Sequence, residues 1–436
     1  MANRATTPGP GLKIVALVIL AASIAIPLSW MVDRMGANIP AVDLLPGHIQ
    51  AVVVGCLLSL TIPFWPGDPW EKRTLLATWV LKLAVVLVAM LFYESAYPTL
   101  DAYSFYAGYS LSPDSIPLDP VYGFSPGDGT GNVTSLVQIL KQVLGASYHS
   151  IKVLFAFAGL GACYVAYCAG VKFVGRKSLI WLLLLLATPS MLFWTGILGK
   201  DPIVVLGIST FLLGAAKYAK DGNSSAAWTI LLGLFVASSM RLWLLPILMI
   251  PLTYLFAKTG PSRVRVPLAG FATLAMVGGA IALAVARGVT SPSDLLPALA
   301  QVSQQWAEGG SAQRIEVPFD SIAGLAAFLP LGAFTALFRP LPMEVPNAFG
   351  LLAGIENLAL LAFGGYIVLR KGLTPLQSRA VVFLMICLAS WALVYALISF
   401  QNLGTASRFK VQALPILLLL YWVALAKPER KDCAKV

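Results

Sequence analysis

Long apolar runs, separated by shorter polar stretches, form the main pattern along the chain. A helix needs about 20 apolar residues to cross the hydrocarbon core of a bilayer, and many runs approach this length. The pattern predicts an all-α polytopic membrane protein with about twelve spans. The predicted spans are residues 14–31, 49–65, 74–93, 150–170, 178–197, 202–218, 225–240, 242–257, 266–286, 348–369, 378–399 and 411–426.

The run 323–338, "AGLAAFLPLGAFTALF", raises the question of a thirteenth span. If it does not cross, both termini lie inside, and the inner connections carry the excess of Lys and Arg that cytoplasmic loops usually show. If it crosses, Arg370, Lys371 and Arg379 move outside. We therefore expect 323–338 to be a re-entrant or interfacial segment.

Composition agrees with this class and excludes others. Of 436 residues, 58% are hydrophobic and 11% charged, whereas soluble domains carry about 25% charged residues. The isoelectric point near 9.4 is then a consequence of cytoplasmic topology, and no nucleic-acid-binding module accompanies the basic residues. The five cysteines fall in apolar runs or the tail, which argues against a disulfide framework or a thiolate metal site. His48 and His149 lie far apart in sequence, so a histidine zinc site is not expected.

Two long loops are predicted on the outer face of a single integral membrane domain, residues 1–436. They cover residues 94–149 and 287–347 and are rich in Pro, Gly, Ser and Asp. The first includes "SLVQILKQVLGA", residues 135–146, whose apolar residues recur at helical spacing. We expect that piece to be an amphipathic helix on the membrane surface.

The predicted topology brings charged residues from distant loops to the outer face. Arg and Lys there would hold the phosphate of a lipid-linked substrate, and a carboxylate would take a proton from an attacking hydroxyl. The residues concerned are Asp101, Lys200, Asp201, Arg241, Arg339, Glu344 and Arg408.

Asp101 lies in "YPTLDAYSFYAGYS", shortly after the third predicted span. In a functional interpretation it is a general base, with Tyr103 and Tyr106 available to stack on a sugar. In a structural one, Asp101 is the N-cap of a surface helix and the tyrosines belong to an interfacial belt.

The pair Lys200–Asp201 in "GKDP" allows two similar interpretations. Asp before Pro202 is typical of a helix start, with Asp as N-cap and Pro at the first helical position. Lys200 either snorkels to the headgroups or helps to bind an anion near that helix start.

Three further segments supply polar residues. "SSMRLWLLP" places Arg241 between two short spans, and "LFRPLPMEVPN" adds Arg339 and Glu344. "SFQNLGTASRFKVQALP" places Asn402 and Arg408 before the last span.

Glu356 lies about 12 Å inside its predicted span at 1.5 Å per residue. A carboxylate at that depth needs a partner or a polar cavity, so Glu356 is either a functional group or part of a structural pair. Lys82 has a similar depth, and its longer side chain can snorkel.

Five segments in this order carry a resemblance: "DAYSFYAGY", "LFWTGILGKDP", "MRLW", "LFRPLPMEVPN…LLAGIEN" and "NLGTASRFKVQALPILLLL". Over residues 95–425 the chain resembles bacterial polytopic membrane proteins of surface-polysaccharide assembly. Those are similar to GT-C-type glycosyltransferases, which use polyprenyl-phosphate-linked sugars. The resemblance implies a bacterial inner (plasma) membrane location with cytoplasmic termini and an extracytoplasmic active site.

The resemblance also implies roles for particular residues. Asp101 matches the catalytic acidic residue of the first outer loop, and Arg408 matches an arginine of the last loop. Lys200 and Asp201 match a Lys-acidic hairpin. Arg241 matches an arginine that is followed by Pro-His in those proteins and by Leu-Trp here. Many members carry two adjacent acidic residues beside the catalytic position, a pair that this chain lacks.

The sequence therefore predicts a membrane glycosyltransferase with Asp101 as base. Lys200, Arg241, Arg339 and Arg408 would bind the donor phosphate, and Tyr103, Tyr106, Asp201, Glu344, Glu356 and Asn402 would support the site. The expected partners are a polyprenyl-phosphate-linked sugar, a glycan or lipid acceptor and membrane lipid. No cofactor is required by the pattern, although a divalent metal is compatible with it.

Two alternatives stay open. The first is a polymerase that joins repeat units carried on polyprenyl diphosphate, which needs nearly the same groups. The second is a lipid or glycan transporter or flippase without catalysis, which predicts a polar path through the membrane.

Overall fold

A computed structural model describes residues 44–96, 100–108, 128–222, 225–259, 262–286, 288–307, 311–313 and 321–426, together with isolated positions between 23 and 30. In these residues the regular structure is helical, apart from one isolated bridge between Ala312 and Asn402. Most of the predicted span 14–31, the two chain ends and parts of both long loops lie outside the described residues. The chain forms two compact units: unit 1 is residues 1–161 and 192–203, and unit 2 is residues 162–191 and 204–436.

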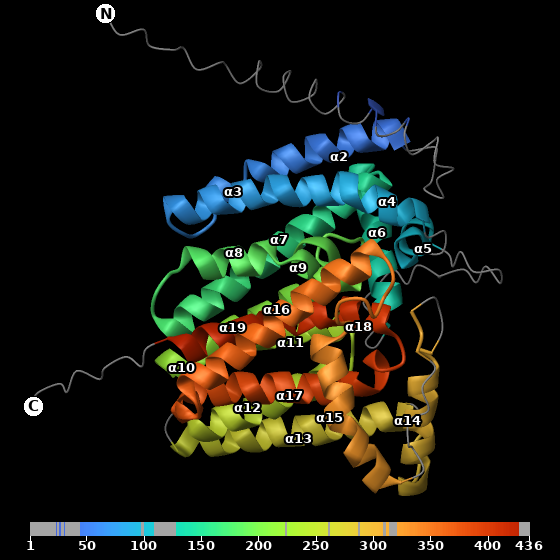
Figure 1. The fold of residues 1–436 in the computed structure, drawn as a ribbon. Coiled ribbons are helices and arrows are strands. Elements are labelled where there is room, and N and C mark those ends of the chain that lie inside the picture. Colours follow the sequence, from blue (N-terminus) through green and yellow to red (C-terminus); the bar gives the residue numbers. More distant parts are fainter. Residues whose placement is uncertain are drawn as a thin grey trace, which may run out of the picture. The chain divides into compact units, whose positions relative to one another are not determined.

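Unit 1 contains the first helices and the start of α7 (Figure 1). The helix α3 continues through a π-helical turn, η3, into α4, and the three form one apolar stretch of 27 residues, Pro69–Ser95. The elements are α2 (Leu44–Ser59), η2 (Ile62–Phe64), α3 (Pro69–Ala84), η3 (Val85–Ala89), α4 (Met90–Ala96), α5 (Asp101–Ala107), α6 (Gly129–Leu144) and α7 (Tyr148–Val174).

Unit 2 contains the remaining helices, apart from the end of α9 and the first residues of α10, which belong to unit 1. Within it α12 packs along α13 and α17, and α15 crosses α17 at a steep angle (Figure 1). The elements are α8 (Leu179–Ala187), α9 (Pro189–Trp194), α10 (Lys200–Asp221), α11 (Ser225–Met240), α12 (Leu244–Lys258), α13 (Ser262–Ala286), η4 (Pro292–Asp294), α14 (Leu295–Gln304), α15 (Ile322–Phe338), α16 (Ala348–Lys371), η5 (Thr374–Gln377), α17 (Arg379–Ser399), α18 (Leu403–Phe409), η6 (Lys410–Gln412) and α19 (Leu414–Leu425).

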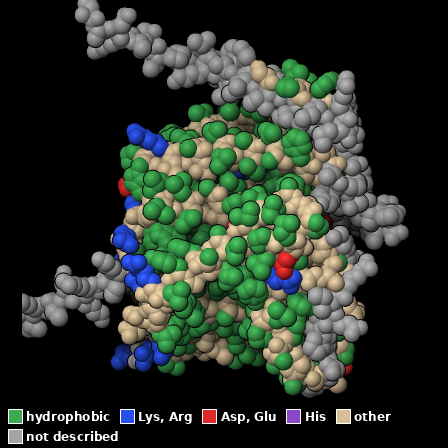
Figure 2. Space-filling view, viewed as in Figure 1, with side chains coloured by type: hydrophobic (Ala, Val, Ile, Leu, Met, Phe, Trp, Pro, Cys, Tyr) green, Lys and Arg blue, Asp and Glu red, His purple; other side chains and the backbone are tan. Residues whose placement is uncertain are grey.

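This is a multi-pass membrane protein. Among the described residues, seven helices are long and apolar enough to cross a bilayer, and the pair 403–412 and 414–425, bent by 58°, would make an eighth. Hydrophobic side chains cover much of the face shown in Figure 2. The seven are Leu45–Phe64, Pro69–Ser95, Tyr148–Val174, Lys200–Asp221, Arg265–Ala282, Ala348–Lys371 and Arg379–Ser399.

The predicted span 178–197 is not one helix. It breaks between α8 and α9, because Pro189 has no backbone N–H and disfavours helical geometry in the residue before it. Thr188 accordingly has φ −56° and ψ 128°. The run 323–338 forms α15, whose 17 residues are short for a crossing, and its interfacial position stays a prediction.

Close backbone contact holds α11 against α10 in unit 2. A Cβ atom at Gly207 would fall 2.5 Å from the backbone nitrogen of Ala237, and one at Gly214 would fall 2.6 Å from that of Ile230. Small residues spaced in this way allow helices to pack tightly in a membrane, where burial from water gives no driving force. The short helix α11 is thereby fixed beside a long one.

Candidate functional site

The predicted site residues divide between the two units. Five belong to unit 1: Asp101, Tyr103, Tyr106, Lys200 and Asp201. Six belong to unit 2: Arg241, Arg339, Glu344, Glu356, Asn402 and Arg408.

In unit 1, Asp101 is exposed in the first turn of α5, directly after the N-cap residue Leu100. It therefore belongs to the helix itself and is not the N-cap. Because α5 ends at Gly108, whose φ is +81°, and packs against α6, it is a short helix held by its neighbour. The carboxylate stands at the end of that helix, where solvent reaches it.

The two tyrosines of α5 have different environments. Tyr103 is 1% exposed and its hydroxyl donates to the Glu94 carbonyl at 3.1 Å. Burial, followed by the charge of Glu94, raises the pKa of Tyr103. Tyr106 is half-buried, and the Lys141 ammonium lies 4.2 Å from its ring centre. Of the two rings, Tyr106 is the one with accessible surface for a ligand.

Lys200 and Asp201 both lie in the first turn of α10, so the helix begins two residues earlier than an Asp201 N-cap requires. The Lys200 ammonium donates to the Thr130 hydroxyl of α6 at 2.7 Å. Asp201 is fully buried. Lys200 thus connects the start of α10 to α6, the helix that also supports α5.

Sequence reasoning missed a buried ion pair in unit 1. The Lys152 ammonium lies 2.7 Å from one Glu94 carboxylate oxygen, and the Tyr148 hydroxyl donates to the other at 2.8 Å. Glu94 and Lys152 are 1% and 0% exposed. The sequence carried one sign of this pair: Glu94 and Lys152 each stand next to an apolar run. A charge that is buried in apolar surroundings needs a partner.

Two further observations concern unit 1. His48 and His149, far apart in sequence, lie side by side and buried, with their ring centres 3.9 Å apart. Lys82 does not snorkel: it is 2% exposed and donates to the Thr195 hydroxyl at 2.5 Å and to the Leu192 carbonyl at 3.3 Å. In the described part of the chain, no three His, Cys, Asp or Glu side chains form a metal-ligand group.

In unit 2, Glu356 has the partner that its depth requires. Its carboxylate lies 3.2 Å from the Lys410 ammonium and accepts the Ser190 N–H at 2.7 Å. Lys410 also donates to the Asn357 side-chain oxygen. Glu356 is 7% exposed and Lys410 is fully buried, so this is a structural pair inside the helices.

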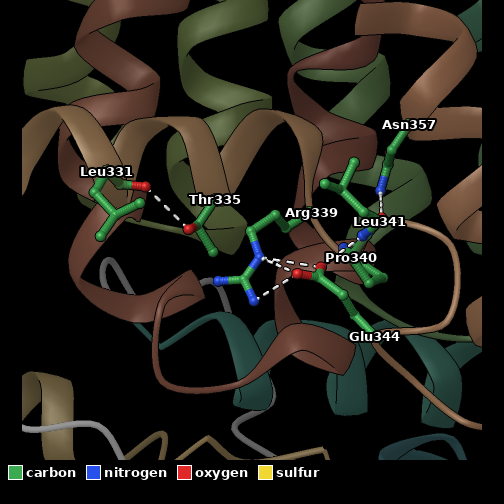
Figure 3. A network of polar contacts seen from close by, with 7 residues as sticks. All are labelled: Leu331, Thr335, Arg339, Pro340, Leu341, Glu344 and Asn357. Atoms are coloured by element: carbon green, nitrogen blue, oxygen red, sulfur yellow. Dashed lines mark hydrogen bonds and ion pairs between the residues drawn. The ribbon is translucent and has the colours of Figure 1, made fainter.

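The same network extends to the connection between α15 and α16. The Asn357 amide donates to the Pro340 carbonyl at 2.7 Å. The Arg339 guanidinium contacts both Glu344 oxygens at 2.7–3.0 Å, and Glu344 also accepts the Leu341 N–H (Figure 3). The connection turns between Leu341 and Glu344, where the Glu344 N–H donates to the Leu341 carbonyl at 3.1 Å and the Glu344 carboxylate binds both its own segment and Arg339.

The electrostatics of Glu344 follow from these contacts. Burial alone would raise the pKa of its carboxyl group, but the hydrogen bonds from Arg339 and Leu341, with the charge of Arg339, lower that pKa overall. Glu344 is therefore an ionised anchor for Arg339, and the pair is partly exposed, at 26% and 19% respectively.

The helix α18 gathers the remaining residues of unit 2. The Arg241 guanidinium, 6% exposed, lies 4.2 Å from the Phe409 ring centre. The Asn402 side chain accepts the Thr405 N–H at 3.0 Å and caps α18, and half-buried Arg408 lies in the last turn. With Lys410 following directly, α18 and η6 bring cationic groups from two distant segments together.

A comparison of the chain with protein-family models, curated proteins and solved structures gives no match. The arrangement described above therefore has to be interpreted from its own chemistry.

Proposed function

We propose that the protein is a membrane glycosyltransferase with a GT-C-like fold of about twelve spans. It would transfer a sugar from a polyprenyl-phosphate-linked donor to a glycan or lipid acceptor on the extracytoplasmic face of a bacterial inner membrane. Asp101 would deprotonate the acceptor hydroxyl, and fixed cations would stabilise the charge that builds on the departing phosphate.

The observation that carries the proposal is the exposure of Asp101. Glu94 and Glu356 are buried, at 1% and 7% exposed, whereas Asp101 is exposed in the first turn of the short helix α5. A carboxylate that solvent and an acceptor can reach suits proton transfer from a sugar hydroxyl.

Each cation of the proposal lies within its own unit. Lys200 is fixed by Thr130 in unit 1, and Arg241 and Arg408 lie at α18 in unit 2. Arg339 is held by Glu344 and would keep its remaining N–H groups for a phosphate, since a guanidinium carries five donors.

The test uses the purified full chain in lipid, supplied with pooled lipid-linked sugars from its host. Mass spectrometry identifies the free lipid carrier that is released. We expect polyprenyl monophosphate from the native chain and none from Asp101→Asn or Arg408→Ala, each still inserted and monodisperse. Asp294→Asn is the matched control, because Asp294 is also a loop aspartate at a helix start, bonded to Thr290 and Ser291. Full turnover by the Asp101 variant would contradict its role as base.

One observation favours the polymerase as a second candidate. The acidic residue nearest to Asp101 on its N-terminal side is Glu94, and Lys152 and Tyr148 occupy both of its carboxylate oxygens. Glu94 is thus unsuited to bind a metal together with Asp101. A polymerase would release polyprenyl diphosphate in the same experiment, and release of neither carrier would favour the transporter.

A further inference from the structure

A basic pocket lies at the opposite end of α12 from Arg241. That helix has 15 residues, so its ends are about 22 Å apart. The pocket has a volume of about 550 Å³ and is lined by Ala257, Lys258, Arg265, Val266, Ala269 and Arg379. It lies wholly within unit 2, between the end of α12 and the starts of α13 and α17.

The charge of this pocket has one sign. Among the described residues that line it, three are cationic and none is acidic. Arg379 is held in place, because its guanidinium donates to the Lys258 carbonyl at 2.8 Å. In the described part of the chain, neither the Lys258 ammonium nor the Arg265 guanidinium has an ion-pair partner. Three cations around one hollow form a site for an anion with several oxygens, such as a phosphate group.

An exposed apolar surface continues from the pocket along α13. Val266 lines the pocket and is 66% exposed. Further along the helix Phe271 is 64% exposed, and a row of exposed residues continues from Val266 with Leu274 at 74%, Val277 at 45%, Ile281 at 58% and Val285 at 60%. Their spacing of eight, three, four and four residues keeps them on one face of the helix. In a membrane protein such a face contacts acyl chains.

We propose that this pocket binds the headgroup of an anionic phospholipid, with the acyl chains along the exposed face of α13. Basic pockets between membrane helices on the cytoplasmic side are suited to such headgroups. Lys and Arg side chains lie at the lower left of Figure 2, where α12 ends and α17 begins in Figure 1. The predicted topology places these loops inside, so the lipid belongs to the inner leaflet. The proposal does not depend on the glycosyltransferase function.

The test measures lipid binding to the detergent-purified full chain by native mass spectrometry, with dioleoylphosphatidylglycerol as probe and dioleoylphosphatidylcholine as the zwitterionic reference. The variant Lys258→Gln/Arg265→Gln removes two pocket charges whose side chains make no ion pair. The matched variant Arg370→Gln/Lys371→Gln removes two basic residues from the end of α16, outside the pocket lining. Elution from a sizing column checks that each variant is folded.

We expect phosphatidylglycerol to bind the pocket variant about twenty- to thirtyfold more weakly than the native chain, from the contribution of each basic residue near a lipid phosphate. The α16 variant should change less than threefold. Equal losses in both variants would mean diffuse charge attraction and overturn the site. Glycerol 3-phosphate binding as tightly as the lipid, with the same loss in the pocket variant, would overturn the lipid assignment in favour of a soluble phosphate ligand.

Discussion

Two buried lysine–glutamate pairs, one in each unit, differ in what they connect. In unit 1 each Glu94 oxygen has its own donor, Lys152 or Tyr148, and the contacts stay between α4 and α7. In unit 2 the Glu356–Lys410 contact is longer, at 3.2 Å against 2.7 Å, and Lys410 is shared with Asn357. The first pair fastens two helices, whereas the second also positions a connecting segment.

A buried charge therefore has a different structural consequence in each unit. Both pairs satisfy the rule that a buried charge needs a partner. Only the unit 2 pair is linked by further hydrogen bonds, from Lys410 to Asn357 and from Asn357 to the Pro340 carbonyl, to the segment that carries Arg339 and Glu344. Removing it should therefore alter both stability and the placement of that segment, and removing the unit 1 pair should mainly alter stability.

The largest effect should come from breaking the unit 1 pair on one side. Glu94→Gln leaves the Lys152 ammonium buried without a carboxylate, and loss of one member of a buried pair costs about 3–5 kcal/mol. The measurement is the midpoint of thermal unfolding of the detergent-solubilised chain, which should fall sharply.

The double variant Glu94→Gln/Lys152→Met tests the reason for that loss. It removes both charges and should recover much of the stability, since an apolar replacement of a whole buried pair is often neutral. A double variant no more stable than Glu94→Gln would show that charge pairing is not the main contribution.

Breaking the unit 2 pair on one side should lower the free energy of unfolding by a smaller amount. Glu356→Gln keeps a side chain that can still accept from Ser190 and leaves Lys410 bonded to Asn357, so we expect a loss of about 2 kcal/mol, typical of a hydrogen bond to a charged group. Carrier release in the transferase assay should also fall, because the Arg339 segment loses its support. If the Glu356→Gln chain is less stable but releases the lipid carrier at the native rate, the pair contributes to packing alone.

The Asn357→Leu variant separates the two connections of that network. It removes the hydrogen bond to Pro340 while leaving the Glu356–Lys410 contact. We expect a loss of about 1–2 kcal/mol from the unsatisfied Pro340 carbonyl and Lys410 donor, and greater protease sensitivity in residues 339–347. Limited proteolysis followed by mass spectrometry measures this sensitivity. The control is Asn402→Leu, which removes the cap of α18 and should leave cleavage within residues 339–347 unchanged.

The smallest effect should come from Arg339–Glu344, because an exposed or partly exposed pair contributes at most about 1 kcal/mol. The folded state lowers the pKa of Glu344, so its contribution is present above the ordinary carboxyl pKa of about 4.3 and is lost as the pH falls through the lower folded value. The unfolding midpoints of native and Glu344→Gln chains should thus converge below pH 4. A difference that persists there would mean that the charge is not responsible.

Much of the helical layout could be predicted from apolar run lengths alone. The long spans from residue 45 to residue 174, and those of α10, α16 and α17, follow from the runs, and α6 follows from the helical spacing in residues 135–146. The break at Thr188 was missed because an apolar run can continue across a proline. The start of α10 was missed by two residues, since Lys200 and Asp201 are both compatible with a cap or a first turn.

The partners of the polar residues could be predicted only in part. The depth of Glu356 required a partner, but nothing local distinguished Lys410, 54 residues later, from other cations. Glu94 and Lys152, or His48 and His149, are likewise joined only by the packing of separate helices. Arg339 and Glu344 are five residues apart, and their pairing depends on a turn that the prolines did not reveal.

The lengths of the apolar runs are enough to show that the chain crosses a membrane several times as helices, because each helix satisfies its backbone hydrogen bonds internally and is set by its own apolar length. The partners of the buried charges, and the exposure of Asp101, follow from the tertiary structure. Contacts between residues distant in the chain depend on helix packing, and packing in a membrane depends on shape and polar contacts rather than on the hydrophobic pattern that marks the spans.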